Sequence, residues 1–154
     1  MDKKQVLKKC LGFLGDKIRD MEKSLASIQK GVIDSPGPSQ SHSDTTRFQQ
    51  SNVALGVDRR IEELKEKVFL LQGVDLTPKD TIFVGALFTL RYEGARENMV
   101  YFLVQKGEGD TIEIDSEEVM FISANAPIAE AVIGKKKGDK ISFRNRVLEI
   151  VEVQ

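Results

Sequence analysis

The sequence has no tryptophan, one cysteine and one histidine, and these shortages exclude several kinds of site. Cys10 has no partner for a disulfide within the chain. Because His42 is the only histidine, the chain cannot build a cysteine–histidine zinc cluster. No run approaches the roughly 18 apolar residues of a membrane span. The N-terminus, MDKKQVLKKCLGF, lacks the long apolar core of a signal peptide. We therefore expect a soluble cytoplasmic protein without a membrane partner.

An excess of charge of either sign is also absent. The chain has 23 Lys and Arg against 24 Asp and Glu, which gives a net charge of -1. Bulk charge therefore predicts neither tight nucleic-acid binding nor membrane attachment, and a nucleic-acid partner would need a local patch. With 154 residues, 40% of them hydrophobic, the chain suits one domain of ordinary size or two small ones.

Two stretches of the first half carry apolar residues in alternating steps of four and three. The first seam is Leu7, Leu11, Leu14, Ile18, Met21, Leu25, Ile28 and Val32, and the second is Ala54, Val57, Ile61, Leu64, Val68 and Leu71. Two such seams joined by a polar linker predict an antiparallel coiled-coil hairpin over residues 1–75. Pro36, Gly37 and Pro38 cannot continue a helix, so the tip is expected at about residues 34–44.

The distal end of this hairpin is expected to be held less tightly than its base. Arg47 and Gln50 continue the second seam backward as polar residues, where they would face Ile28 and Val32. Polar residues at core positions of a coiled coil reduce its stability, so we predict fraying there.

The second half, residues 79–154, is expected to form a separate β-rich domain, because Gly73 and Pro78 mark a boundary. Runs rich in β-branched and aromatic residues predict strands at 81–92, 98–105, 111–114, 119–123, 140–143 and 147–153. The fold class is therefore α+β: an N-terminal antiparallel α-helical coiled-coil hairpin and a C-terminal antiparallel sheet of five or six strands with one short helix.

The short helix is predicted from about Ile128 to Ile133. Pro127 fits its first turn, because the N–H that proline lacks would be unpaired there, and Asn125 is the expected cap. Gly134 is expected to end the helix in the left-handed conformation.

The stretch from Ile122 to Asp139, ISANAPIAEAVIGKKKGD, resembles the C-terminal domain of the Gre family, bacterial factors that bind RNA polymerase. In that family a strand leads to S-x-N-S-P-I/L, a short A-L-hydrophobic-G helix, K-x-x-G-D and two final strands. The matching residues are Ser123, Asn125, Pro127, Ile128, Ala131, Gly134, Lys135, Gly138 and Asp139. Ala126 departs from the family, which usually has Ser there. The run Arg60 to Leu64 also resembles the R-I-x-E-L of the second Gre helix.

This resemblance implies an FKBP-like C-terminal domain and a function carried out on another enzyme. In Gre factors the hairpin enters the secondary channel of RNA polymerase, where its acidic tip helps hold a magnesium ion and the attacking water. The polymerase then cleaves its own backtracked RNA. The chain would thus be a regulator and not an enzyme, with bacterial RNA polymerase and the nascent RNA 3′ end as partners. It would need no cofactor of its own beyond Mg²⁺ in the polymerase active site, and we expect a monomer.

The same resemblance suggests two groups of binding residues. Asn125, Pro127 and Ile128 match the loop that seats Gre C-terminal domains on the polymerase. Alternatively, Pro127 only begins the helix and Ile128 packs beneath it. Gre hairpins also carry a basic patch that faces RNA, and the candidates here, which could equally form a solvated helix face, are Lys8, Lys9, Lys17 and Arg19.

The tip departs from the family pattern, which reads roughly D-x-x-E-N-x-E-Y. Between Glu22 and Asp58 the only acidic residues are Asp34 and Asp44. Asp44 either reaches a magnesium ion shared with the polymerase or, like Ser43, caps the second helix, whereas Asp34 is expected to be a turn residue. The altered tip leaves two mechanisms open: weak stimulation of transcript cleavage by Asp44, with or without Asp34, or occupation of the channel without cleavage.

Two other classes of function are compatible with parts of the pattern. An FKBP-type prolyl isomerase would need an aromatic-lined proline pocket, commonly with Trp at its floor. This chain has no Trp, and its only tyrosines are Tyr92 and Tyr101. A scaffold protein would use the heptads in an intermolecular coiled coil and the β domain as a passive head.

Overall fold

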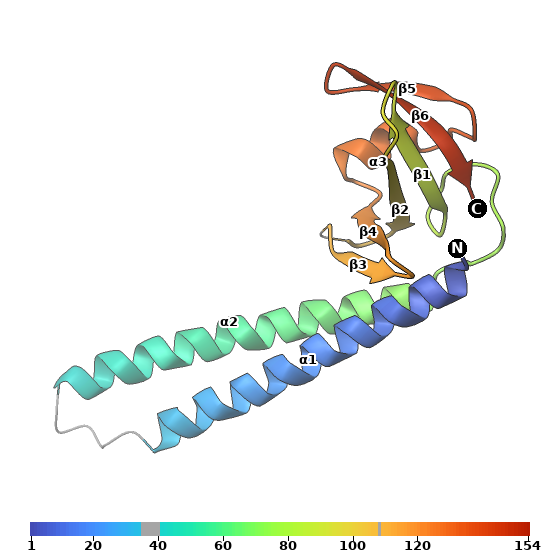
Figure 1. Ribbon diagram of the computed structural model, residues 1–154. Helices are drawn as coiled ribbons and strands as arrows, with labels where there is room; N and C mark the ends of the chain where they lie inside the picture. Colours follow the sequence, from blue (N-terminus) through green and yellow to red (C-terminus); the bar gives the residue numbers. More distant parts are fainter. Residues whose placement is uncertain (35–40, 108) are drawn as a thin grey trace. The chain divides into compact units, whose positions relative to one another are not determined.

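The computed structural model describes residues 1–34, 41–107 and 109–154; the side chains of residues 32, 41–44 and 46 lie outside the description. The elements in chain order are α1 (Lys3–Ile33), α2 (Ser41–Gln72), β1 (Leu87–Tyr92), β2 (Asn98–Val104), β3 (Thr111–Ile114), β4 (Glu117–Ser123), α3 (Pro127–Val132), β5 (Lys140–Phe143) and β6 (Arg146–Val153) (Figure 1). The contacts divide the chain into two compact units. We call Gly12–Val68 the hairpin unit, and Met1–Leu11 together with Phe69–Gln154 the β unit. Within the described residues, no helix is long and apolar enough to cross a membrane.

The hairpin unit confirms the predicted coiled-coil pairing. Its fully buried apolar side chains, Leu14, Ile61 and Leu64, all belong to the two seams. Lys65 Nζ lies 3.2 Å from Glu22 Oε1 and joins the two helices, which run side by side in Figure 1. The helices therefore pack along the seams that the heptad spacing predicts.

The predicted caps of the second helix are wrong. Helix α2 begins at Ser41, so Ser43 and Asp44 lie inside its first turn and not before it. The helix extends further toward the tip than the caps suggested, because serine and aspartate are also tolerated within a first turn. Most of the predicted tip, residues 35–40, lies outside the described residues.

The β unit contains one six-stranded sheet with the order β3-β4-β2-β1-β6-β5. Four of its strand pairs are antiparallel, but β2 and β4 are parallel, so the prediction of an antiparallel sheet is corrected to a mixed one. The connection through β3 explains this pairing, because it carries the chain back to the starting end of β2 before β4 begins. A parallel pair needs such a crossover, whereas an antiparallel pair can be joined by a short turn.

The first predicted strand is also shorter than expected. Only Leu87–Tyr92 pair as β1, and Thr81 forms an isolated bridge with Lys136. Gly85 interrupts the run with φ +89°, and a Cβ at this position would lie 2.2 Å from the carbonyl oxygen of Asp75. Only glycine fits this approach, so the chain turns here before the ladder starts.

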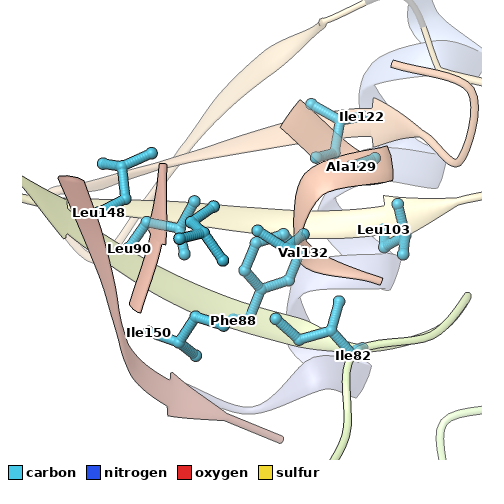
Figure 2. Packing of buried hydrophobic residues seen from close by; sticks show 11 residues of the cluster. Ile82, Phe88, Leu90, Leu103, Ile122, Ala129, Val132, Leu148 and Ile150 are labelled. Carbon is cyan, nitrogen blue, oxygen red and sulfur yellow. The ribbon is translucent and has the colours of Figure 1, made fainter. Parts of the chain in front are cut away.

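The core of the β unit lies between the sheet and α3 (Figure 2). From the helix, Ala129 and Val132 are fully buried, and they pack with apolar side chains from five of the strands or their flanks. These partners are Ile82, Ala86, Phe88, Leu90, Leu103, Ile122, Ile141, Leu148 and Ile150. On the other face of the sheet the rings of Phe102 and Phe121 meet edge to face with centroids 5.4 Å apart. The short helix therefore covers one face of the sheet.

Candidate functional site

The residues predicted to seat on a partner are Asn125, in the loop between β4 and α3, and Pro127 and Ile128, in the first turn of α3. Asn125 and Pro127 are exposed, whereas Ile128 is half-buried and packs against the core. Pro127 begins the helix and Ile128 packs beneath it, as the structural alternative had it, and contact of these residues with a partner stays a prediction.

Asn125 is not the cap of α3, which corrects that prediction. The N-cap is Ala126, with extended backbone angles and no side-chain hydrogen bond, and Pro127 follows in the first turn as expected. Ser123 organises the loop: its Oγ accepts from Asn125 N–H at 3.2 Å and its carbonyl accepts from Ala126 N–H at 2.9 Å. Since proline needs no acceptor, the helix begins without a polar cap and the Asn125 side chain stays available.

The end of α3 agrees with its prediction. Gly134 has φ +79°, and its N–H donates to Ile82 O at 2.9 Å. The following turn, Lys135 to Gly138, carries three exposed lysines.

The four candidate RNA-facing cations do not share one environment. Lys8 and Lys9 belong to the β unit, where Lys9 Nζ lies 4.0 Å from Asp115 Oδ1, whereas Lys17 and Arg19 belong to the hairpin unit. Arg19 pairs with Asp16 at 2.9 Å, and Lys17 Nζ lies 5.9 Å from the ring centroid of Phe13. These contacts are exposed and contribute little to stability. All four cations therefore remain accessible to a phosphate.

Asp34 and Asp44, the two acidic candidates of the tip, lie on either side of residues 35–40, which are outside the described residues. Asp34 follows α1 and is exposed, with its N–H donating to Lys30 O at 2.9 Å, as a residue at a helix end does. The backbone of Asp44 lies within α2, but its side chain is among those outside the description, as is that of His42. In the described part of the chain no three His, Cys, Asp or Glu residues gather to hold a metal ion. A role of Asp44 at a magnesium ion stays a prediction.

The distal hairpin carries an exposed apolar surface that the heptad analysis missed. The exposed fractions are 79% for Ile33, 68% for Phe48, 54% for Val53 and 65% for Leu55. A shallow groove of about 560 Å³ is lined by Gln29, Ile33, Ser51, Ala54, Leu55 and Asp58. The exposed residues Ile33, Phe48, Val53 and Leu55 lie outside the two seams, and listing the apolar residues that the seams leave out would have found them. The described part of the distal hairpin thus presents apolar side chains on its surface.

Sequence reasoning also missed the polar cluster at the base of the β unit. Lys3 is only 7% exposed, and its Nζ donates to Thr77 O at 2.7 Å and more weakly to Gly85 O at 3.4 Å. Burial, and then the charge of Lys79, lower the pKa of Lys3, while Asp75 raises it. Asp75 accepts from Lys79 Nζ at 2.7 Å and from the N–H and Oγ1 of Thr77, both at 2.9 Å. These bonds hold the pKa of Asp75 well below its usual value.

The hairpin and the mixed sheet with one covering helix define a two-part protein made of a helical hairpin and a small α+β domain. Residues 77–154 match the family model described as "Transcription elongation factor, GreA/GreB, C-term". The chain belongs to this family of transcription elongation factors, because the match covers half of its length.

Individual relatives agree with the assignment. The chain is 26% identical over 151 residues to transcription elongation factor GreA of Alkalilimnicola ehrlichii, covering 90% of this chain and 92% of the relative. It is 34% identical over 101 residues to GreA of Azorhizobium caulinodans, which covers 62% of this chain and only 60% of the relative. A solved structure of Thermus aquaticus Gfh1 aligns over 99% of this chain and 94% of its own, with 17% identity and a TM-score of 0.38, which is too low to add to the assignment. These matches do not support the prolyl isomerase alternative.

Proposed function

We propose that the chain regulates transcription elongation by binding bacterial RNA polymerase, with its β unit seated on the enzyme through the β4–α3 loop and its hairpin in the secondary channel. The observation that carries this proposal is the family match over residues 77–154, which includes the exposed Asn125 and Pro127. The protein is then a cytoplasmic regulator that acts as a monomer, and any RNA cleavage is performed by the polymerase.

Within this function, occupation of the channel without efficient cleavage is the mechanism that the distal hairpin favours. Magnesium is held by oxygen ligands, and carboxylates supply them best. Here the only acids between Glu22 and Asp58 are Asp34 and Asp44, and the described surface nearby is apolar at Ile33 and Phe48. Such a surface suits contact with protein or with the RNA 3′ end better than it suits coordination of a metal. Asp44 is the residue that would approach the Mg²⁺ ion of the polymerase if cleavage is stimulated.

Binding to core RNA polymerase tests the proposed contact through Asn125 and Pro127. We expect Asn125→Ala to weaken binding about fivefold, since a lost polar contact at an interface costs about 1 kcal/mol. Asn98→Ala is the matched control, because Asn98 is also exposed but lies at the start of β2. Equal affinities of the two variants would contradict the proposed contact of Asn125 with the polymerase. Failure of the wild-type protein to bind would contradict the proposed function.

An RNA cleavage assay on backtracked complexes separates the two mechanisms. We expect the wild-type protein to leave the rate of cleavage unchanged or to lower it, and Asp44→Ala to behave in the same way. Stimulated cleavage that disappears in Asp44→Ala would instead establish the metal-assisted mechanism.

A further inference from the structure

Two arginines of the β5–β6 hairpin are stacked on aromatic rings at the surface of the β unit. The Cζ of Arg146 lies 5.3 Å from the ring centroid of Tyr92, and that of Arg144 lies 5.2 Å from the centroid of Phe143. Phe143 and Arg146 are also directly opposite each other in the pairing of β5 with β6. These four residues therefore form one continuous cluster, which we call the arginine cluster. Both arginines are exposed, so their N–H groups remain accessible to a partner while each guanidinium lies over its ring.

The backbone beneath the cluster is in a conformation that arginine rarely adopts. Arg144 and Asn145 form the two-residue turn between β5 and β6, with φ +49° and +62°. Such turns favour Asn and Gly, because a side chain with a Cβ is strained in the left-handed region. Asn145 fits this preference and Arg144 does not. A long cation at a position where a smaller residue would stabilise the turn indicates a role other than folding.

The carboxylates around the cluster are already paired with other cations. Glu93 binds Lys140 at 2.7 Å, and Glu149 binds Arg91 at 3.0 Å. Neither Arg144 nor Arg146 pairs with a carboxylate among the described residues. The chain as a whole has a net charge of -1, yet this surface carries two uncompensated guanidinium groups.

A shallow groove of about 540 Å³ adjoins the cluster. It is lined by Tyr92, Glu93, Gly94, Ala95, Arg146 and Val147. Glu93 N–H donates to Val147 O at 3.0 Å, which fixes the end of β1 beside β6. Val147 is 37% exposed, so the groove offers an apolar surface next to the cationic edge of Arg146.

We propose that the arginine cluster and its groove bind single-stranded nucleic acid. The N–H edges of Arg144 and Arg146 suit phosphate oxygens, which they can hold with two parallel hydrogen bonds. The exposed Arg146 guanidinium and the groove beside it suit a base, since bases stack on guanidinium and aromatic planes. An acidic peptide would use the charges but not the flat surfaces, so nucleic acid fits more of the observed features. This site lies in the β unit and shares no residue with the proposed polymerase seat.

Fluorescence anisotropy with a labelled single-stranded RNA of 12 nucleotides at low ionic strength tests the proposal. The test variant is Arg144→Asn with Arg146→Gln, in which asparagine tolerates the left-handed turn. We expect its affinity to fall about tenfold, which corresponds to losing phosphate contacts and one stacked base. The control is Lys135→Ala with Lys137→Ala, which removes the same charge from the exposed turn after α3 and is expected to change affinity less than about twofold.

A third variant, Arg144→Lys with Arg146→Lys, distinguishes the planar groups from charge alone. We expect binding several-fold weaker than in the wild-type protein, because lysine keeps the charge but neither stacks nor forms paired hydrogen bonds. The proposal is overturned if this variant binds as tightly as wild type, or if the lysine control loses as much affinity as the arginine variant. It is equally overturned if the wild-type protein does not bind the RNA, or if a poly-glutamate peptide displaces the RNA at equal charge concentration. Circular dichroism of each variant shows that the fold is retained.

Discussion

Lys3 Nζ donates a hydrogen bond of 2.7 Å to the carbonyl oxygen of Thr77, which joins the first turn of α1 to the segment between α2 and β1. The two residues are 74 positions apart in the chain. A second, longer bond from the same Nζ reaches Gly85 O, just before β1. One buried amine therefore ties the first turn of α1 to two points of the segment between α2 and β1.

Replacing Lys3 by Ala should reduce the stability of the β unit. The substitution removes the partly buried hydrogen bond to the Thr77 carbonyl, and the loss of a typical hydrogen bond costs about 0.5 to 1.5 kcal/mol. We expect the free energy of unfolding in urea to fall by about that amount. Lys4→Ala is the control, because Lys4 is exposed on the same turn of α1 and should change stability by less than about 0.5 kcal/mol. Equal effects of the two substitutions would show that the Lys3 bonds contribute nothing.

Asp75 should make the stability of the β unit depend on pH. Its pKa in the folded protein is lowered by the Lys79 ammonium and the two Thr77 donors, whereas the unfolded value is 3.8. A depressed carboxyl pKa contributes stability that is fully present above the unfolded value and is lost as the pH falls through the folded one. Thermal unfolding of wild type and Asp75→Asn should therefore show a stability difference at pH 6 that shrinks below about pH 4. A difference that stays constant down to pH 2 would contradict this account.

Glu113 and Glu118 face each other across β3 and β4, and like charges in this arrangement repel. Both are exposed, and neither forms an ion pair within the described residues. Glu113→Lys should convert the repulsion into an attraction and raise the free energy of unfolding by about 0.2 to 1 kcal/mol. In the control Glu152→Lys the cross-strand partner is the uncharged Thr89, so no comparable gain is expected. A loss of stability in Glu113→Lys would show that the pair is not repulsive.

Hydrogen exchange should be faster at the distal end of the hairpin than near its base. Leu64 is buried in the seam, whereas Gln50 occupies a seam position as a half-buried polar residue whose Oε1 accepts no hydrogen bond from the described residues. Few buried apolar contacts permit local opening at low free energy. We expect amides around Arg47 to exchange at least tenfold faster than those around Leu64. Equal protection would mean that the polar positions do not loosen the hairpin.

The hairpin could be predicted because its pattern is local and repeats. Steps of four and three from Leu7 to Val32 suffice to place one face of a helix, and the buried Leu14, Ile61 and Leu64 lie on those faces. The parallel pairing of β2 with β4 could not be predicted in this way, since it depends on how a distant segment crosses over. Composition identified the strands but not their order in the sheet.

The candidate site was predicted only in part for a similar reason. The sequence motif identified Asn125 and Pro127. The prediction that Asn125 caps α3 was wrong, because Ser123, two positions earlier, accepts the hydrogen bonds of the loop. The Lys3 cluster has no sequence signal, because its acceptors are backbone carbonyls that any residue could supply. The arginine cluster likewise requires knowing that Tyr92 of β1 lies beside Arg146 of β6.

The measurement that tests the central claim most directly is competition between this protein and a known Gre factor for bacterial core RNA polymerase. If the chain occupies the secondary channel, it should displace the labelled Gre factor completely at saturation, and the apparent affinity of each should fall as the other is added. Binding of both proteins to the same polymerase, or the absence of displacement by a folded wild-type chain, would contradict the account.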